Sequence, residues 1–333
     1  MNHRRLSPTT VLLVLTLVLA VAAVAHLMLG SSRLSCGQFL ATLAGHGDWK
    51  QNLLVLHLRL PRSVLAMLIG ASVAVSGVIL QGISRNDLAS PDTLGINAGS
   101  GLGMMLFLVW FPAAATQWPL AMPLVAIAGA GATTALVFAL AYRQGSVLPA
   151  RLLLVGIALG LGGQAAMLLF SLRMSFAMYG YVLTWMSGTL AGGDWRAAAF
   201  LLPWPVLILP WMLGRAKTLD VLALGDVSAM GLGVAAGRER LLLTSAATML
   251  TSASVAIGGH IGFLGLAAPH LARRLVGHRH AVLIPAAALT GATLLLVADT
   301  LARRVLAPVE IPAGVFVGIL GGIYFLYLLA TTG

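Results

Sequence analysis

Asp299 has the residue type and position most suggestive of chemistry. It lies inside an apolar segment, and Arg303 follows one helical turn later. A carboxylate within such a segment is a candidate functional residue, because its charge is costly to place in apolar surroundings. An Asp–Arg pair four residues apart on a helix also neutralises that charge. We favour this second interpretation and predict a structural ion pair between Asp299 and Arg303.

The remaining reactive residue types form no catalytic or metal-binding pattern. His260, His270, His278 and His280 are not paired with acids at ligand spacing, which predicts solvated histidines and no metal site. The sequence shows neither clustered aspartates nor a nucleophile–base constellation, so we predict no catalytic residue and no cofactor.

One short motif imitates a nucleotide-binding site. Residues 214–218, Gly-Arg-Ala-Lys-Thr, resemble the end of a phosphate-binding loop. The glycine directly before the lysine and a preceding buried strand are both missing from the pattern. We interpret the match as coincidence and predict a protein that is not an enzyme and does not hydrolyse ATP itself.

The composition predicts a protein whose main solvent is lipid. Of 333 residues, 59% are hydrophobic and only 9% are charged, whereas soluble domains carry about 25% charged residues. The formal net charge is +11. The basic residues are scattered between apolar segments rather than gathered on one face, which argues against nucleic acid as a partner.

Apolar windows define the fold class. A helical span needs roughly 20 apolar residues. Ten windows have suitable character: residues 10–29, 63–83, 95–111, 118–142, 152–172, 197–213, 241–259, 261–275, 284–301 and 311–329. They predict an all-α polytopic membrane protein, whose short eighth window is a candidate broken or re-entrant helix. Arg4 and Arg5 make the first window imitate a secretory signal, which we interpret as an uncleaved span. Ser90-Pro91 predicts a helix cap before the third window.

Glycines recur four residues apart in three of these windows. They are Gly95, Gly99 and Gly103, then Gly156 and Gly160, then Gly314, Gly318 and Gly322. Small residues at this spacing let helix backbones approach closely in lipid. The spacing predicts helix packing and leaves open whether the same helices surround a pathway.

The basic residues predict an orientation. With the N-terminus inside, the inner segments hold twelve of the 20 Lys and Arg residues and the outer segments hold eight. This bias follows the positive-inside rule only weakly, so the outer arginines need a further explanation. The longest polar interruption, residues 214–240, falls inside and predicts one or two short amphipathic helices. Blocks of four spans flank the sixth span, which predicts an inverted repeat.

A series of different motifs follows in a fixed order between residues 52 and 329. Among them are Arg59-Leu60-Pro61-Arg62, Gly77-Val78-Ile79-Leu80-Gln81-Gly82, Trp185-Met186-Ser187-Gly188-Thr189-Leu190, Leu224-Gly225-Asp226, Gly262-Phe263-Leu264-Gly265-Leu266 and Ile311-Pro312-Ala313-Gly314-Val315. In this order they resemble the FecCD-type (BtuC-like) permeases of binding-protein-dependent importers, which serve ferric siderophores, haem and cobalamin. The amino-acid sequences of residues 81–83, 89–92 and 308–312 are most similar to those of ferric dicitrate permeases.

The resemblance implies the fold, partners and location of the protein. It implies a type II ABC importer permease fold, formed by the whole chain 1–333 as one transmembrane domain of the bacterial inner membrane. Iron(III) dicitrate is the expected cargo, and cobalamin or haem is the alternative. The expected partners are two cytoplasmic ATPase subunits, a second identical or paralogous permease and a periplasmic or lipid-anchored substrate-binding protein. The fifth and tenth spans and a short helix near residues 181–191 are expected to line the path.

The resemblance also assigns roles to particular residues. Arg59, Arg62 and Arg303, at the outer ends of two spans, are expected to bind acidic residues of the binding protein, because a guanidinium holds a carboxylate with two hydrogen bonds. Segment 214–240 is expected to be the cytoplasmic coupling segment that docks on the ATPase, through Leu224, Gly225, Asp226, Ala229, Leu232 and Gly233. Gly233 is predicted to follow a helix end in the left-handed conformation.

The loop between the fourth and fifth spans is short and rich in turn-forming residues. It is expected to form part of the inner gate, because it joins a helix that the resemblance places on the path. The gate residues are Gly145, Ser146, Val147 and Pro149. An ordinary turn is the alternative.

Two other classes of membrane protein were considered. A secondary transporter normally needs ionisable residues within its spans, and Asp299 is the only acid well inside a span. A membrane enzyme such as a prenyltransferase would need clustered acids. Both classes therefore fit the sequence less well than an ATP-driven permease.

Overall fold

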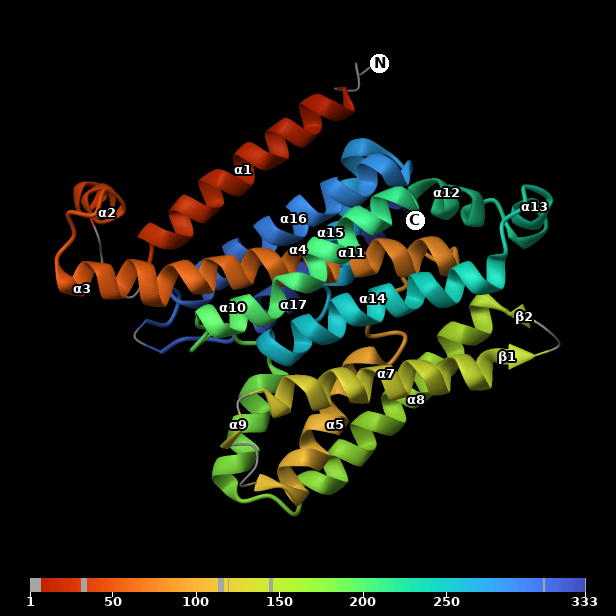
Figure 1. Cartoon of the computed structure of the whole chain (residues 1–333), viewed down its shortest axis with the longest axis horizontal. Helices are drawn as coiled ribbons and strands as arrows, with labels where there is room; N and C mark the ends of the chain where they lie inside the picture. Colours follow the sequence, from red (N-terminus) through yellow and green to blue (C-terminus); the bar gives the residue numbers. More distant parts are fainter. Residues whose placement is uncertain are drawn as a thin grey trace.

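The computed structural model describes residues 7–30, 35–112, 117–118, 120–143, 146–307 and 309–332, and most of them lie in helices (Figure 1). In chain order the elements are α1 (Pro8–Met28), α2 (Cys36–Leu43), α3 (Trp49–Asn52), a π-helical segment η1 (Leu53–Arg59), α4 (Leu60–Ser84), α5 (Ile96–Trp110), α7 (Ala121–Ala141), β1 (Tyr142–Arg143), β2 (Ser146–Val147), α8 (Pro149–Ser171), α9 (Phe176–Met186), α10 (Trp195–Leu201), α11 (Pro203–Gly214), α12 (Ala216–Ala223), α13 (Asp226–Gly231), α14 (Ala236–Gly258), α15 (Leu264–Val276), α16 (His280–Ala302) and α17 (Ala313–Thr332).

The helices confirm the predicted all-α polytopic class. Seven helical stretches in the described residues are long and apolar enough to cross a membrane. The shorter helices α5, α15 and α17 coincide with the three remaining windows. The eighth window contains α15, a helix of 13 residues with Pro269 inside it. Thirteen helical residues extend about 20 Å, which is shorter than the roughly 30 Å hydrocarbon core.

Two helix starts differ from the prediction. The second span begins at Trp49 and runs through α3 and η1 into α4, although the apolar window begins only at residue 63. Polar residues in the first turns concealed this start. The third span begins at Ile96, because turns occupy the preceding residues and Gly95 adopts φ +70°. Ser90 therefore caps no helix, and that prediction was wrong.

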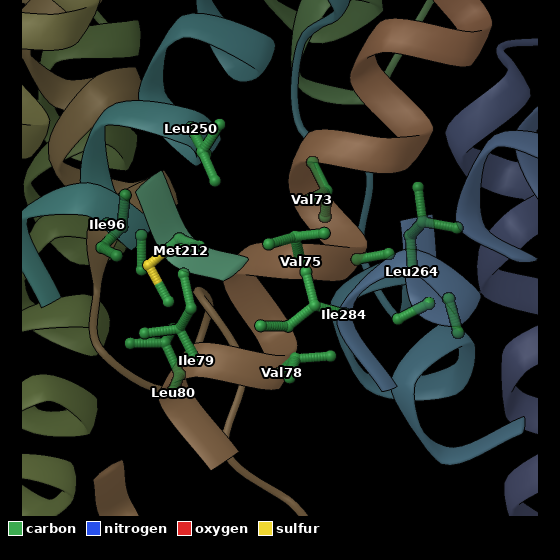
Figure 2. Packing of buried hydrophobic residues seen from close by; sticks show 14 of the residues in the cluster. Val73, Val75, Val78, Ile79, Leu80, Ile96, Met212, Leu250, Leu264 and Ile284 are labelled. Carbon is green, nitrogen blue, oxygen red and sulfur yellow. The ribbon is translucent and has the colours of Figure 1, made fainter. Parts of the chain in front are cut away.

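α4 forms the centre of the bundle. In its most apolar stretch 78% of the residues are buried, against 11% for α1. α4 packs against α14, α15 and α16, while α5, α7 and α8 form a layer on one side and α1 lies along the opposite side (Figure 1). Side chains of α4 meet Met212, Leu250 and Ile284 from three other helices (Figure 2). α1 exposes apolar side chains along its length, as a helix facing lipid must.

Glycines permit the closest helix contacts. A Cβ atom at Gly70 of α4 would lie 2.5 Å from the Gly291 carbonyl oxygen of α16. Gly99 and Gly103 of α5 pack in the same way against Gly129 of α7. The helix-packing prediction is therefore confirmed for that ladder.

The two ends of the bundle differ in their elements. α2 and α3 lie at one end, called here the α3 end, and α12, α13 and the β1–β2 hairpin lie at the other, called the α13 end (Figure 1). These two ends carry the polar clusters described next.

Candidate functional sites at the two ends of the bundle

Asp299 is the centre of a buried ionic cluster at the α3 end. It lies near the end of α16 and is fully buried. Arg62 of α4 donates two hydrogen bonds to its carboxylate, from Nε to Oδ2 at 2.9 Å and from Nη2 to Oδ1 at 2.8 Å. Arg303 Nε lies 3.3 Å from Oδ2, so the i,i+4 pair is formed. The strongest ion-pair partner of Asp299 is thus Arg62, which lies on another helix.

His26 is a member of this cluster that the sequence analysis missed. It lies in the last turn of α1, with Nε2 2.8 Å from Asp299 Oδ2 and Nδ1 2.7 Å from Ser63 Oγ. The order of groups matches a Ser–His–Asp triad. Ser63, however, is only 1% exposed, and its hydroxyl donates to the Arg59 carbonyl at 2.9 Å. The arrangement therefore serves structure, and its one sequence signal is a lone histidine in an uncharged apolar window.

Arg59 and Arg303 hold the end of α1. Arg59 Nη1 donates to the carbonyl oxygens of Leu27 at 2.7 Å and Met28 at 3.1 Å. Arg303 Nη2 donates to the carbonyl oxygen of His26 at 3.0 Å. The last carbonyl groups of a helix have no partner within the helix, and a positive charge is favourable there. Both guanidinium groups are buried, so they fasten the end of α1 to η1 and to the end of α16.

The three arginines nevertheless share one opening. A cavity of about 300 Å³ at the α3 end is lined by Arg59, Arg62 and Arg303 together with His57, Asp194 and Glu310. Arg62 is 11% exposed and donates to Glu310 Oε2 at 2.8 Å, while Glu310 is 37% exposed. Residues that are far apart in sequence are therefore brought to a single charged hollow.

The segment expected to bind an ATPase forms two short helices at the α13 end. α12 buries Leu219 and Leu222 against the bundle. α13 buries only Ala229 and turns apolar side chains outward, including Val227, which is 82% exposed, and Met230, which is 61% exposed. Leu224 and Leu232 beside it are also exposed. Exposed apolar patches of this kind mark interaction surfaces.

The backbone and the charge of α13 are both specified by particular residues. Gly233 follows the helix end with φ +79°, as predicted, and Gly225 precedes it with φ +108°. Asp226 points inward and pairs with Arg240 and Arg85. The hydrogen bonds from Arg240 lower the pKa of the Asp226 carboxyl below its ordinary value.

The expected gate residues lie at the same end. Ser146 and Val147 form β2, which pairs with β1 in a short antiparallel hairpin. Pro149 is the first residue of α8 and lines a cavity of about 780 Å³ with Ser84, Arg85 and other residues of the α4–α5 connection. Gly145 lies outside the described residues.

The solvated-loop interpretation was wrong for His280 and for His270, which lies in α15 with its ring against Tyr324. His260 does lie in a loop, with its side chain 39% exposed, but both His260 and His280 have acidic partners. His280 is buried at the start of α16, with Nδ1 2.6 Å from Asp220 Oδ1. His260 Nε2 lies 2.7 Å from Asp92 Oδ1. Their acidic partners come from segments 60 and 168 residues away, respectively, which sequence spacing cannot reveal. Within the described parts of the chain, no group of three possible metal ligands occurs.

The described residues thus form a bundle of apolar helices with a buried ionic cluster at one end and an exposed apolar helix at the other. The profile of the FecCD transport family matches residues 15–331. The chain is 41% identical over 333 residues to the iron(3+)-hydroxamate import system permease protein FhuG of Bacillus subtilis, covering 99% of both chains. It is 40% identical to the Fe(3+)-citrate import system permease protein YfmE of the same organism, covering 98% of this chain and 97% of that one.

The solved structures agree with the sequence relatives. An inward-facing metal-chelate type ABC transporter matches with a TM-score of 0.86 and 31% sequence identity, covering 97% of this chain and 99% of that chain. The chain therefore belongs to the FecCD transport family, and its fold is that of an ABC transporter permease, as the motifs predicted.

Proposed function

We propose that this chain is the membrane permease subunit of an ATP-driven importer for ferric siderophores in the bacterial inner membrane. The main support for this proposal is the exposed apolar surface of α13, in a chain that belongs to this family. This surface lies at the end of the bundle opposite the arginine-lined hollow. The α13 end then faces the cytoplasm and the α3 end faces outward. The whole chain acts as one transmembrane domain, with residues 214–240 as its coupling segment.

The proposed partners fit the two ends. Two cytoplasmic ATPase subunits dock on the coupling segments of this chain and of a second permease, with Val227 and Met230 as the apolar contacts. ATP binding and hydrolysis then drive alternation between outward and inward openings. The path is lined by α8, α9 and α17, where Gly318 and Gly322 face open space. The loop at Ser146, Val147 and Pro149 forms part of the inner gate.

The substrate-binding protein docks at the α3 end. Arg62 is the most exposed of the three arginines that line the hollow, so it is the first contact for an acidic side chain. Arg59 and Arg303 support the hollow from behind while they hold α1. Complementary charge across such a contact mainly raises the association rate and weakens with salt.

The cargo is a ferric chelate, with iron(III) dicitrate as the specific proposal. The sequences of the motifs favour dicitrate. The overall identities of 41% to a permease named for hydroxamate and 40% to one named for citrate do not distinguish these two substrates. Cobalamin or haem is the alternative cargo.

The test is uptake in a host without its own iron-chelate permeases. The chain is expressed with a P-loop ATPase and a binding protein from its own genome, and uptake of radioiron as dicitrate or hydroxamate chelates is compared with uptake of cobalamin and haem. Import of dicitrate that disappears when the ATPase P-loop lysine is replaced supports the proposal. Uptake that needs no ATPase and follows the proton gradient would instead show a secondary transporter.

A further inference from the structure

Asp226 joins α13 to the body of the bundle. It is the first residue of α13. Its Oδ1 accepts from Arg240 Nη2 at 2.5 Å and from Arg85 Nη2 at 3.0 Å, and its Oδ2 accepts from Arg240 Nη1 at 2.9 Å. In the part of the chain that the structure describes, no other side chain of α13 makes a hydrogen bond or ion pair. The carboxylate is thus the polar attachment of this helix.

The two arginines belong to the most buried spans. Arg240 lies in the first turns of α14, is 3% exposed, and its Nε also points to the Ile83 carbonyl oxygen near the end of α4, at 3.4 Å. Arg85 follows α4 in the left-handed conformation, with φ +53°. One carboxylate therefore links α13 to the same end of both α4 and α14.

This link also reaches the inner mouth of the bundle. Arg85 starts the connection between α4 and α5, which lines the cavity of about 780 Å³ together with Pro149 at the start of α8. The bidentate pair of Asp226 is formed with Arg240, and it fixes the orientation of α13 relative to α14 as well as its distance. Arg85 adds one hydrogen bond at 3.0 Å, through which a displacement of α13 reaches the connection that borders the proposed gate.

We infer that Asp226 is a positioning residue that transmits movement of the ATPase-docking helix to α4, α14 and the α4–α5 connection. Its carboxylate points away from the exposed apolar contacts, so it is not itself an ATPase contact. This inference rests on the proposed function, because it requires an ATPase on α13. If α13 moved freely relative to Arg85, its nucleotide-driven displacement would not move α4 or the α4–α5 connection.

The chain offers a matched control in the same segment. Glu239 pairs with Arg215 at 2.5 Å, and this pair involves neither α13 nor α4. Asp226→Asn keeps the size of the side chain but removes its charge, and Glu239→Gln makes the same change at the control position. Arg85→Gln, which leaves the Asp226–Arg240 pair intact, serves as a second and milder variant.

The first measurement is transport efficiency in proteoliposomes that hold the whole complex. We expect Asp226→Asn to keep its ATPase subunits and its basal ATP hydrolysis, while chelate imported per ATP falls about tenfold, within the usual range of coupling between sites. In Arg85→Gln the chelate imported per ATP should fall by less than in Asp226→Asn. In Glu239→Gln it should equal that of the unmodified complex. Loss of ATPase binding in Asp226→Asn alone would make Asp226 a docking residue and overturn the inference.

The second measurement is the distance between spin labels at Ser228→Cys and Leu88→Cys, two exposed positions, in a Cys36→Ser background. In the unmodified complex this distance should stay constant when ATP analogue binds, because the two elements move together. In Asp226→Asn it should change. A constant distance and normal efficiency in Asp226→Asn would overturn the inference, whereas an unmodified chain that binds no ATPase at all would overturn the proposed function.

Discussion

Replacing Asp299 by Asn tests whether the buried cluster holds α1 to the bundle. The carboxylate has four nitrogen donors within 3.3 Å: two from Arg62, one from Arg303 and one from His26. An asparagine keeps one oxygen, and its amide group would face donors instead of acceptors. Removing one partner of a buried ion pair costs about 3–5 kcal/mol, because the opposite charges stay buried and uncompensated.

The consequence is a measurable loosening of the first span. Leu27, beside His26, is buried, so a cysteine at this position reacts with a thiol reagent only when the end of α1 opens. Local opening made easier by about 3 kcal/mol or more should raise the labelling rate about a hundredfold. Glu310→Gln is the control, because Glu310 is 37% exposed and partly exposed pairs contribute about 1 kcal/mol or less.

The assay compares labelling of Leu27→Cys in detergent, in a Cys36→Ser background. Asp299→Asn should label far faster than the parent, and Glu310→Gln should stay within about fivefold of it, since 1 kcal/mol is a factor of about five. If Asp299→Asn labels at the parent rate, the cluster does not hold α1, and the structural role assigned to Asp299 is refuted.

Three further predictions concern the proposed partners and gate. Gly233→Val should insert normally but lose uptake, because a branched residue at φ +79° costs about 1–2 kcal/mol; normal uptake with normal ATPase co-purification would contradict this. A cysteine at Val147 should change its reactivity when ATP analogue binds, and insensitive labelling would place the gate elsewhere. Arg62→Gln should lower binding-protein affinity, most at low salt, and keep the ATPase bound, because Arg62 is the most exposed of the three arginines. Unchanged, salt-independent affinity would show that the arginine-lined hollow is not the docking site.

Each of the seven helices in the described residues that are long and apolar enough to cross a membrane overlaps an apolar window, because a backbone in lipid must form its hydrogen bonds within the segment. The same signal located the second span but not its start at Trp49, since hydropathy does not register a helix that continues through polar residues. Gly233 was predictable for a local reason as well. A glycine just past the end of a helix commonly takes the left-handed conformation, because it has no Cβ atom to oppose it.

The charged sites depended on tertiary structure. The sequence offers Asp299 one obvious partner, Arg303, because sequence spacing reveals only contacts between residues about one turn apart on the same helix. Its strongest ion-pair partner, Arg62, lies 237 residues away, and His26 lies 273 residues away.

The orientation of Asp226 was equally hidden. The motif placed it among the residues expected to meet an ATPase, and packing turned it inward onto Arg240 and Arg85 while Val227 and Met230 faced outward. Sequence alone therefore determined the family, the apolar spans and the two short helices between residues 214 and 240, because periodicity and ordered motifs are properties of the chain itself. Only the folded structure decided which charges meet, because that depends on how helices distant in sequence pack against one another.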